Sequence, residues 1–375
     1  MQGPVRVLYV NGGALDYGGV TTVMLNYAKH FDPEKVQVDF LVHGMEPGPR
    51  EAEAKALGAE VIHVPYKVPH YFGNRAALLR AFSQGGYHVV HAHMDGMNGY
   101  ILPLAKKAGV PVRVSHSHNT RFLTTNPVRV WMHRRAAGRI EQAATAMLAC
   151  SPAAGRFLYG TGAMAAGRVT VMPNAMELER YAFDREKRRA VREKYALRDG
   201  FVIGHIGRFD YQKNQAFLLP VLQRLLTQVP DARLVLVGDG ADRPSAEAQA
   251  ARLGVREAVV FPGFVADVPG MLSAFDAFAL PSRFEGLGIV LVEAQASGLT
   301  CLASEAVPRE TKVTDCRYLS LEDPTAWAKA LQQIAAAPKG EHARRIVDMD
   351  AFVEAGYDIK SEAEKLQRMY LELVK

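Results

Sequence analysis

The feature that most constrains this chain is a β–α alternation that runs through it twice. Short apolar runs rich in β-branched residues alternate with helical patterns, which is typical of parallel sheets covered by helices. In the front half the expected strands are Val5–Val10, Val36–Val42, Val61–Val64, His88–His91, Val112–Ser115, Met147–Ala149 and Val169–Met172. In the back half they are Phe201–Ile206, Leu234–Val237, Val259–Phe261, Ala277–Leu280 and Thr300–Ala303. The alternation predicts an α/β chain with two Rossmann-like, doubly wound domains.

The alternation breaks once, near Pro173-Asn174, before a charge-rich stretch at residues 185–194. We therefore predict a first domain over residues 1–172 and a second over 173–357. A charged amphipathic helix from Ser361 to Val374 follows the second domain, and we expect residues from about 358 to 375 to pack back on the first. We expect ligands in a central cleft that the two domains face, because strand ends and helix N-termini converge there.

Charge is divided unevenly along the 375 residues. Residues 1–173 contain 18 Lys+Arg and 10 Asp+Glu, whereas the remainder contains 27 and 29, so the front half is basic and suits an anionic partner. No apolar run reaches the ~18 residues of a membrane span, and no signal-peptide pattern precedes Val5. The three cysteines form no C-x-x-C pair. These features predict a cytoplasmic protein with buried thiols and no zinc site.

The segment from Glu285 to Glu293 carries the clearest functional pattern, because two carboxylates bracket glycines that open an apolar helix. A helix beginning near Gly286 would direct free N–H groups and a partial positive charge at a phosphate. Eight helical steps would return Glu293 to within roughly 80° of the direction of Glu285. Both carboxylates would then flank one elongated ligand, which indicates a nucleotide-sugar site.

Two other loops extend this interpretation. After the expected strand Phe201–Ile206, Arg208 and Lys213 offer a guanidinium and an ammonium that suit a diphosphate. In the first domain, Gly18 and Gly19 precede a helix expected to start around residue 20 or 21, and such a turn could approach phosphates closely. An ordinary turn is the alternative. The turn lacks the G-x-G-x-x-G fingerprint that a nicotinamide-dependent dehydrogenase would need.

Short motifs of one kind are spread over nearly the whole chain. They are Gly18-Gly19-Val20, His116-Ser117-His118-Asn119, Val171-Met172-Pro173-Asn174, Gly207-Arg208-Phe209 with Lys213-Asn214, Val237-Gly238-Asp239-Gly240, Phe261-Pro262-Gly263-Phe264, and Pro281-Ser282 through Glu285-Gly286-Leu287-Gly288 to Glu293-Ala294-Gln295-Ala296. This set resembles the family-four retaining glycosyltransferases of GT-B type, particularly those that assemble capsular or extracellular polysaccharide. One departure is Thr21, where many relatives have a glutamate.

The resemblance implies roles for individual residues. Arg208 and Lys213 would hold the diphosphate, Glu285 would meet hydroxyls of the donor sugar, and Glu293 would accept hydrogen bonds from the ribose. The remaining expected substrate-binding positions are the main chain near Gly263 and Phe264 for the base, the amides of Gly286, Leu287 and Gly288, the Gly18-Gly19 loop, and Asn174.

The resemblance also implies a histidine near the reacting sugar carbon, at the exit of Val112–Ser115. The sequence offers His116 and His118 there, and we favour His118 because the polar Asn119 follows it; the choice stays open. His91 and His93 end another expected strand, and we interpret both as packed or strand-capping side chains.

The implied reaction moves a sugar from a nucleotide diphosphate sugar, UDP in many relatives, to a glycan or lipid-linked acceptor. Configuration would be retained, and the leaving phosphate would take the acceptor's proton. We expect no metal or other cofactor, because the sequence shows no clustered His, Asp and Glu ligands, and no nucleic-acid partner. The alternatives are a sugar-nucleotide epimerase or hydrolase, with Asp16 or Asp95 as acid or base, and a noncatalytic nucleotide-sugar-binding protein.

A basic segment from Pro127 to Ile140 bears on the acceptor. It places Arg129, Arg134, Arg135 and Arg139 beside Val130, Trp131 and Met132. A basic helix with an aromatic side chain can lie in the headgroup region of an anionic membrane. We therefore hypothesise peripheral binding at the inner membrane face, with an ordinary solvated helix as the alternative.

Overall fold

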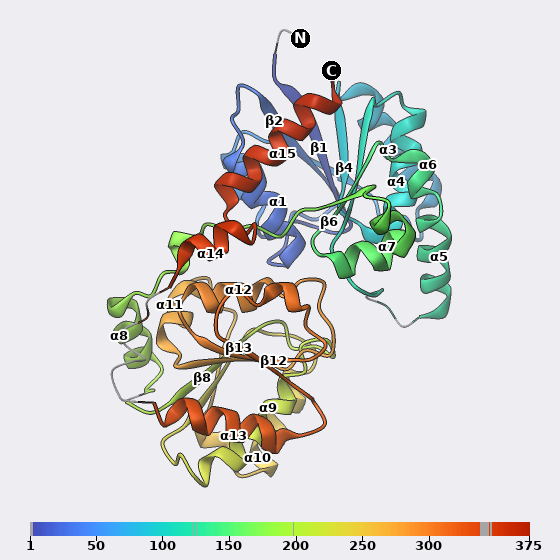
Figure 1. Ribbon diagram of the computed structural model, residues 1–375. Helices are drawn as coiled ribbons and strands as arrows, with labels where there is room; N and C mark the ends of the chain where they lie inside the picture. The colour runs from blue at the N-terminus through green and yellow to red at the C-terminus, as the bar shows by residue number, and fades with distance from the viewer. Residues whose placement is uncertain (1–2, 123, 125, 198, 338–344, 346) are drawn as a thin grey trace. The chain divides into compact units, whose positions relative to one another are not determined.

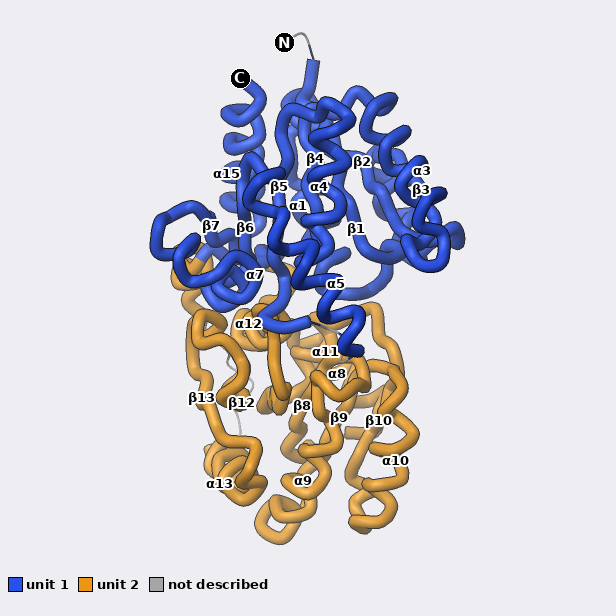
Figure 2. The backbone as a smooth tube through the Cα atoms, turned by 90° about the vertical axis from the view of Figure 1, so that its right-hand side faces the viewer, with its two compact units in different colours: residues 1–177, 356–375 blue, residues 178–355 orange. Residues whose placement is uncertain are grey.

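The computed structural model describes the chain except residues 1–2, 123, 125, 198, 338–344 and 346. The described chain divides into two compact units, coloured separately in Figure 2. Unit 1 comprises residues 1–177 and 356–375, and unit 2 comprises residues 178–355. Each unit contains one parallel sheet with helices on both faces, so the predicted fold class of two Rossmann-like domains is confirmed.

The sheet of unit 1 has seven parallel strands in the order β3-β2-β1-β4-β5-β6-β7. The chain moves outward from β1 to one edge and then returns to β4 and moves to the other, as in doubly wound folds. The strands are β1 Val5–Asn11, β2 Val36–His43, β3 Val61–Val64, β4 Val89–Ala92, β5 Val112–Ser117, β6 Ala146–Ala149 and β7 Val169–Val171.

Helices cover both faces of this sheet (Figure 1). Buried residues of α1 and α15 pack against one face, and those of α3 and α4 pack against the other. The helices of unit 1 are α1 Gly19–His30, α2 Glu51–Ala56, α3 Tyr71–Gln84, α4 Asn98–Lys107, α5 Pro127–Ala137, α6 Ile140–Ala143, α7 Pro152–Ala165 and α15 Ile359–Leu373, with the 3₁₀ helix η1 Asp95–Met97.

Unit 1 runs to Glu177, whereas the sequence placed the domain boundary after residue 172. The connecting residues stay with unit 1 because α1 holds them: Tyr27 Oη donates to the Pro173 carbonyl at 3.1 Å, and Lys29 Nζ lies 2.5 Å from Glu177 Oε1. The closing segment of unit 1 starts at Gly356, and α15 buries its apolar side in the core that α1 also covers.

The sheet of unit 2 has six parallel strands in the order β10-β9-β8-β11-β12-β13. They are β8 Val202–Ile206, β9 Arg233–Val237, β10 Val259–Gly263, β11 Ala277–Leu280, β12 Thr300–Ser304 and β13 Cys316–Leu319. The sequence pattern did not predict β13. This edge strand buries only Cys316 and exposes Arg317, so it lacks the apolar run that marks the central strands.

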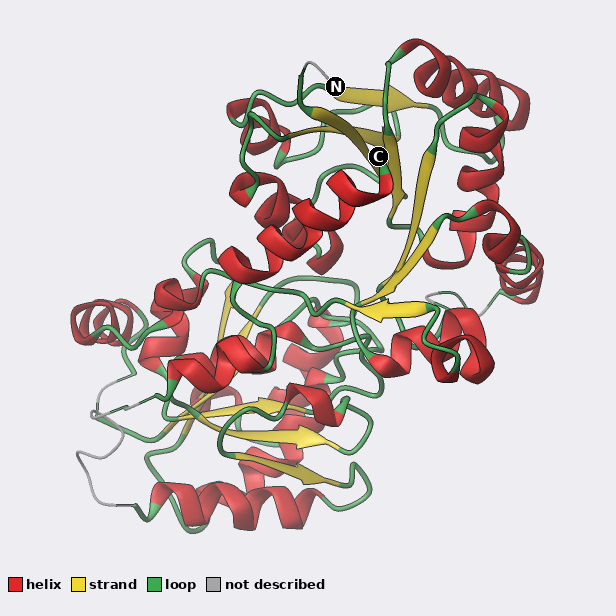
Figure 3. Ribbon diagram, turned by 45° about the horizontal axis from the view of Figure 1, so that its top comes forward, coloured by secondary structure: helices red, strands yellow, loops and turns green. Residues whose placement is uncertain are grey.

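The helices of unit 2 also form two layers, seen with its strands in Figure 3. Side chains of α9, α10 and α13 pack on one face, and those of α11 and α12 pack on the other. The bounds are α8 Arg185–Lys194, α9 Leu218–Leu226, α10 Arg243–Arg252, α11 Val268–Ala274, α12 Ile289–Ala296, α13 Pro324–Ala335 and α14 Met349–Glu354, with the 3₁₀ helices η2 Leu178–Tyr181, η3 Gln215–Phe217, η4 Arg256–Ala258 and η5 Arg309–Thr311. In the part of the chain that the structure describes, no helix has both the length and the hydrophobicity to cross a bilayer.

Candidate active site

The loops that follow β8 and β11 meet at the carboxyl-terminal edge of the unit 2 sheet. The two strands are neighbours, and the strand order reverses between them. Open α/β sheets bind their ligands at such a reversal. Hydrogen bonds tie the two loops together: Asn214 Nδ2 donates to the Pro281 carbonyl at 3.1 Å, and the Arg283 N–H donates to the Gln212 carbonyl at 2.8 Å.

An ion pair between Lys213 and Glu285 lies where these loops meet. Lys213 Nζ is 2.7 Å from Glu285 Oε1, and Ser282 Oγ donates to the same oxygen at 2.6 Å. Gln212 Nε2 donates to the other carboxylate oxygen at 3.1 Å. Glu285 is only 4% exposed, so its charge is withdrawn from water and needs the ammonium beside it. The structure thus brings two predicted site residues, 72 positions apart, into direct contact.

Arg208 lies in the same loop as Lys213 but makes a different contact. Its Nε donates to Asp210 Oδ2 at 2.9 Å, and its side chain is 71% exposed. Asp210 also accepts from the Lys213 N–H at 3.0 Å and so orders the loop. An ion pair this exposed contributes little to stability, so an anion can compete for the Arg208 guanidinium.

The helix after Glu285 begins later than the sequence indicated. We expected it near Gly286, but α12 begins at Ile289, with Gly288 as its N-cap at φ +84°. A residue in this left-handed region cannot continue a right-handed helix, and glycine is the residue that occupies it without strain. Glu285, Gly286 and Leu287 therefore belong to the preceding loop. The prediction that Glu285 and Glu293 lie two turns apart on one helix is wrong.

Glu293 lies in the later part of α12 and faces η2. Tyr181 Oη donates to Glu293 Oε1 at 2.8 Å. Burial raises the pKa of the Glu293 carboxyl above its ordinary value, against the opposing effects of Tyr181 and Lys213. Among the described residues, Tyr181 is the one hydrogen-bond donor to this carboxylate, which therefore keeps capacity to accept hydrogen bonds from ligand hydroxyls.

Three contact residues of this region were absent from the predicted site: Gln212, Ser282 and Tyr181. Gln212 precedes Lys213, and Ser282 lies three residues before Glu285, so both stand within motifs that the sequence already marked. Tyr181 reaches Glu293 from 112 positions away, and no local pattern points to it.

The remaining predicted position in unit 2 is the end of β10. Gly263 is the last residue of that strand and has φ +78°, and its carbonyl accepts from the Gly238 N–H at 2.9 Å. Phe264 follows and is 54% exposed. The main chain here is therefore ordered by the loop after β9, and an exposed aromatic ring lies next to it.

In unit 1 the Gly18-Gly19 turn leads directly into α1, which begins at Gly19 with Gly18 as its N-cap. Asp16 orders the turn, because its Oδ1 accepts from the Gly18 N–H at 2.9 Å and from Thr21 Oγ1 at 3.1 Å. Asn174 is 9% exposed, and its Oδ1 has no hydrogen-bond partner among the described residues. An unpaired buried acceptor of this kind is available to a ligand.

Four buried histidines form an array at the ends of β4 and β5. His91 Nε2 lies 3.2 Å from His116 Nδ1, and His93 Nδ1 lies 2.8 Å from His118 Nε2. The two pairs stack in layers, with ring centroids 4.1 Å apart for His91 and His93 and 4.2 Å apart for His116 and His118. His116 and His118 therefore point the same way. His91 and His93 are packed side chains, as interpreted, but they pack against the two candidate histidines.

All four imidazoles are held neutral by their surroundings. Burial lowers the pKa of His118 to about 3, and burial together with neighbouring histidines lowers the pKa values of His91, His93 and His116 well below their ordinary range. His118 is 6% exposed and follows the last residue of β5, and its Nδ1 has no partner among the described residues.

Asp95 fixes the main chain at His118. Its carboxylate accepts from the His118 N–H at 2.7 Å and from Asn119 Nδ2 at 2.6 Å. Burial raises the pKa of this carboxyl, although both hydrogen bonds oppose the shift. Asp95 therefore positions the segment after β5 from the start of η1.

The same array contains the residues most able to hold a metal ion. One nitrogen from each of His91, His93 and His116 lies within 4.8 Å of the others, and this is the one such group that the described residues form. Imidazole nitrogens suit zinc, copper and nickel. The sequence-based statement that ligand-type side chains do not cluster is therefore wrong, because adjacent parallel strands align two His-x-His pairs.

The basic segment forms α5, whose N-cap Asn126 accepts from the N–H groups of Val128 and Arg129. No residue of α5 is buried, and Trp131 is 61% exposed, with the Arg135 guanidinium 5.9 Å from its ring centroid. Within the described ranges, no carboxylate forms an ion pair with the guanidinium groups of Arg129, Arg134, Arg135 and Arg139. Apolar side chains are not gathered on one face of α5, so it is a basic helix with an exposed aromatic residue.

Comparisons with known proteins agree with this geometry. A model described as "Glycosyl transferase 4-like domain" matches residues 18–175, and one described as "Glycosyl transferases group 1" matches residues 200–337. EpsF of Bacillus subtilis (strain 168), named as a glycosyltransferase, is 35% identical over 385 residues, covering 97% of this chain and 96% of EpsF.

Two further comparisons concern more distant proteins. The Escherichia coli protein named UDP-Gal:alpha-D-GlcNAc-diphosphoundecaprenol alpha-1,3-galactosyltransferase is 24% identical over 314 residues, covering 80% of this chain and 79% of that protein. The crystal structure of Anabaena HepE in complex with UDP-glucose is 19% identical, with a TM-score of 0.77 over 98% of this chain and 99% of that chain. EpsF is matched along nearly its whole length and the HepE fold extends over both units, so this chain belongs to the family-four glycosyltransferases of GT-B fold.

Proposed function

We propose that this glycosyltransferase moves a hexose or N-acetylhexosamine from a UDP-sugar to a glycan or lipid-linked saccharide in capsular or extracellular polysaccharide assembly. The observation that carries the proposal is the Lys213–Glu285 pair at the strand reversal of unit 2, where a cation lies beside a buried carboxylate. The names of the E. coli relative and of the HepE complex support a UDP-sugar donor, and the E. coli name supports a lipid diphosphate acceptor.

In the proposed mechanism, charge develops on the departing diphosphate while the sugar approaches an oxocarbenium ion. Lys213, Arg208 and the amides of Gly286 to Gly288 stabilise the leaving group. The leaving phosphate takes the acceptor's proton, so configuration is retained without a protein base. His118 enters this mechanism as a neutral imidazole, because burial keeps its pKa far below neutral pH.

The remaining contacts of the proposal concern recognition. Glu285 binds hydroxyls of the donor sugar, and Glu293 accepts from the ribose hydroxyls while Tyr181 holds it in place. The base lies against the main chain at Gly263 and Phe264. In unit 1, the Gly18-Gly19 turn and Asn174 are the proposed substrate-binding positions.

A donor screen tests the proposal directly. UDP at 100 times its dissociation constant should stabilise unit 2 by about 2.7 kcal/mol, whereas GDP and ADP at equal concentration should shift its melting temperature less. UDP-glucose, UDP-galactose and their N-acetylated forms are then assayed for transfer to lipid-linked and soluble glycans. Turnover of the donor at the same rate with and without acceptor would identify an epimerase or hydrolase and reject the transferase proposal. Tight UDP binding without any turnover would identify a sugar-nucleotide-binding protein.

We also propose that transfer needs no metal ion, because Arg208 and Lys213 supply the positive charge at the diphosphate. Transfer should proceed at the same rate after dialysis against EDTA, with added Mg²⁺ or Mn²⁺ as the comparison. A rate that falls on dialysis and returns with either ion would refute this part of the mechanism.

A last part of the proposal places unit 1 on an anionic membrane surface through α5. Support comes from the exposed Trp131 and from the α5 arginines that have no described carboxylate partner. A variant carrying Arg134→Glu and Arg135→Glu should sediment less with vesicles of anionic phospholipid. A variant with Arg224→Glu and Arg252→Glu, which changes exposed arginines of unit 2 by the same charge, is the control. Equal sedimentation of both variants would reject membrane binding through α5.

A further inference from the structure

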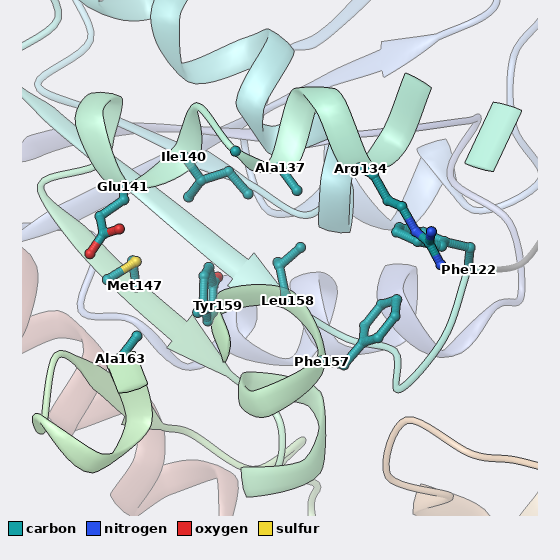
Figure 4. Close-up of a pocket in the computed structure, with 11 residues that line it drawn as sticks. Phe122, Arg134, Ala137, Ile140, Glu141, Met147, Phe157, Leu158, Tyr159 and Ala163 are labelled. Carbon is teal, nitrogen blue, oxygen red and sulfur yellow. The ribbon is translucent and has the colours of Figure 1, made fainter. Parts of the chain in front are cut away.

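A pocket of about 520 Å³ lies beneath α5 in unit 1, between α5, α6, β6 and α7 (Figure 4). Its volume is within the range of small-molecule sites. Polar and apolar groups contribute about equally to its lining, and the apolar part comes from Phe122, Ile140, Met147, Phe157, Leu158 and Ala163. Phe122 packs edge-to-face on Phe157, with ring centroids 4.9 Å apart, so two aromatic rings form one wall. This aromatic wall is suited to a hydrocarbon group.

Three ionisable side chains also line the pocket, and two of them already have partners. Glu141 is paired with Arg168. Tyr159 Oη lies 2.9 Å from the Ser115 carbonyl and 2.9 Å from the Leu148 carbonyl, within hydrogen-bond distance of each. Arg134 has no ion-pair or hydrogen-bond partner for its guanidinium within the described ranges, and it extends from α5 toward Phe122 in Figure 4. The lining thus combines an aromatic wall with an arginine that has no partner among the described residues.

The roof of the pocket is held in place by close backbone packing. A Cβ atom on Gly99 of α4 would lie 1.8 Å from the Ala136 carbonyl oxygen, so only glycine allows α5 to approach α4 this closely. Since α5 buries no side chain of its own, this contact fixes the helix while leaving its pocket side open.

A short chain segment and a hydrogen bond connect the walls of the pocket to β5 and to His118, the predicted residue near the reacting carbon. Phe122 lies four residues after His118 in the chain. On the opposite wall, Tyr159 Oη reaches the Ser115 carbonyl on β5, the strand that carries His116. A ligand held here would present its polar end close to the segment after β5.

We propose that this pocket binds the prenyl diphosphate part of a lipid-linked acceptor. The isoprenoid chain packs against the Phe122–Phe157 wall, and a phosphate oxygen accepts hydrogen bonds from Arg134. A chain bearing a diphosphate matches the lining because it supplies hydrocarbon to the aromatic wall and an anion to the Arg134 guanidinium. This inference rests on the proposed function, and it identifies the acceptor class and the residues that hold it.

The experiment measures binding of farnesyl diphosphate by calorimetry in the presence of saturating UDP, so that the proposed diphosphate site of unit 2 is occupied. The wild-type chain should bind one equivalent. Arg134→Gln should weaken binding about tenfold or more, because a charge-assisted hydrogen bond is lost. Arg135→Gln is the matched control, since Arg135 lies next to it on α5 but does not line the pocket, and it should change affinity less than about threefold. Inorganic diphosphate under the same conditions should not bind.

A third variant tests the hydrocarbon part. Ala137→Trp, on the pocket side of α5, fills the space without changing charge and should also weaken farnesyl diphosphate binding at least tenfold. Undiminished affinity in this variant, an equal loss in Arg134→Gln and Arg135→Gln, or no binding to the wild-type chain would each overturn the proposal. UDP binding by every sample reports on the proposed function separately: UDP bound without farnesyl diphosphate rejects the pocket alone, and UDP unbound rejects the donor assignment.

Discussion

Replacing Lys213 with methionine would leave the Glu285 carboxylate buried without its cation. At the observed 2.7 Å separation and an effective dielectric constant of about 20, the two charges attract each other by about 6 kcal/mol. Part of this attraction offsets the cost of desolvating the Lys213 ammonium, a cost that a methionine side chain does not incur. Removing one partner of a buried ion pair costs about 3–5 kcal/mol. The hydrogen bonds from Ser282 and Gln212 remain, so we expect a loss near 3 kcal/mol.

Calorimetry of thermal unfolding measures this loss. A domain of 150–250 residues shifts by about 2–4 °C for each kcal/mol, so the transition of unit 2 should fall by about 6–12 °C in Lys213→Met. Adding Glu285→Gln removes the unpaired charge while keeping a group that can bond to Ser282 and Gln212. The double variant should therefore recover most of the lost stability.

Sugar transfer separates the structural effect from the catalytic one. Loss of one preorganised group that stabilises developing charge lowers kcat by about 10²–10³-fold. We expect the double variant to be slower than Glu285→Gln alone by this factor, although both are stably folded. Equal rates would show that Lys213 acts only by holding Glu285 and would refute its leaving-group role. An unchanged melting temperature in Lys213→Met would refute the buried ion pair itself.

Two further predictions follow from the same structure. Glu293→Ala should weaken UDP binding, measured by calorimetry, about tenfold or more. Tyr181→Phe removes only the 2.8 Å hydrogen bond to Glu293 and should weaken UDP binding less. Unchanged affinity in Glu293→Ala would refute the proposed contact with the ribose. Acid should unfold unit 1 before unit 2. Burial lowers the pKa of His118 to about 3 and that of His205 in unit 2 to about 4, whereas in the unfolded chain these histidines bind protons near pH ~6.5. The free energy of unfolding therefore falls as the pH drops below that value. Each such histidine contributes a loss of about 1.4 kcal/mol per pH unit. Unit 1 holds four of them in its array, and the raised pKa of Asp95 offsets only one, so coincident acid transitions of the two units would contradict this account.

The central strands could be predicted because their buried residues follow one another in the sequence. β8 and β11 are apolar runs whose neighbours on both faces are helices, and a parallel strand covered on both faces needs such a run. β13 lies at the sheet edge and has one fully buried residue, so its pattern does not differ from that of a loop. The other edge strands, β3, β7 and β10, were predicted because each keeps a run of β-branched residues that β13 lacks.

The start of α12 could not be read from composition in the same way. The glycines at 286 and 288 mark a turn, but the sequence does not state which of them takes a positive φ. Gly288 takes it, and the helix begins one residue later. The structure places Glu285 in the loop after β11 and Glu293 in α12, and their relative direction depends on that single dihedral angle.

The histidine array marks the boundary between what a pattern predicts and what only packing determines. Alternation along a strand places His91 and His93 on one face, and the same holds for His116 and His118 up to the strand end. Pairing β4 with β5 would therefore have predicted a cluster of four imidazoles, had the four been considered together. The contact beyond them is different in kind. Tyr370 Oη lies 2.6 Å from His91 Nδ1 across 279 positions, and although the apolar stripe of α15 predicts that this helix docks on a sheet, only the packed core determines that its tyrosine meets that imidazole.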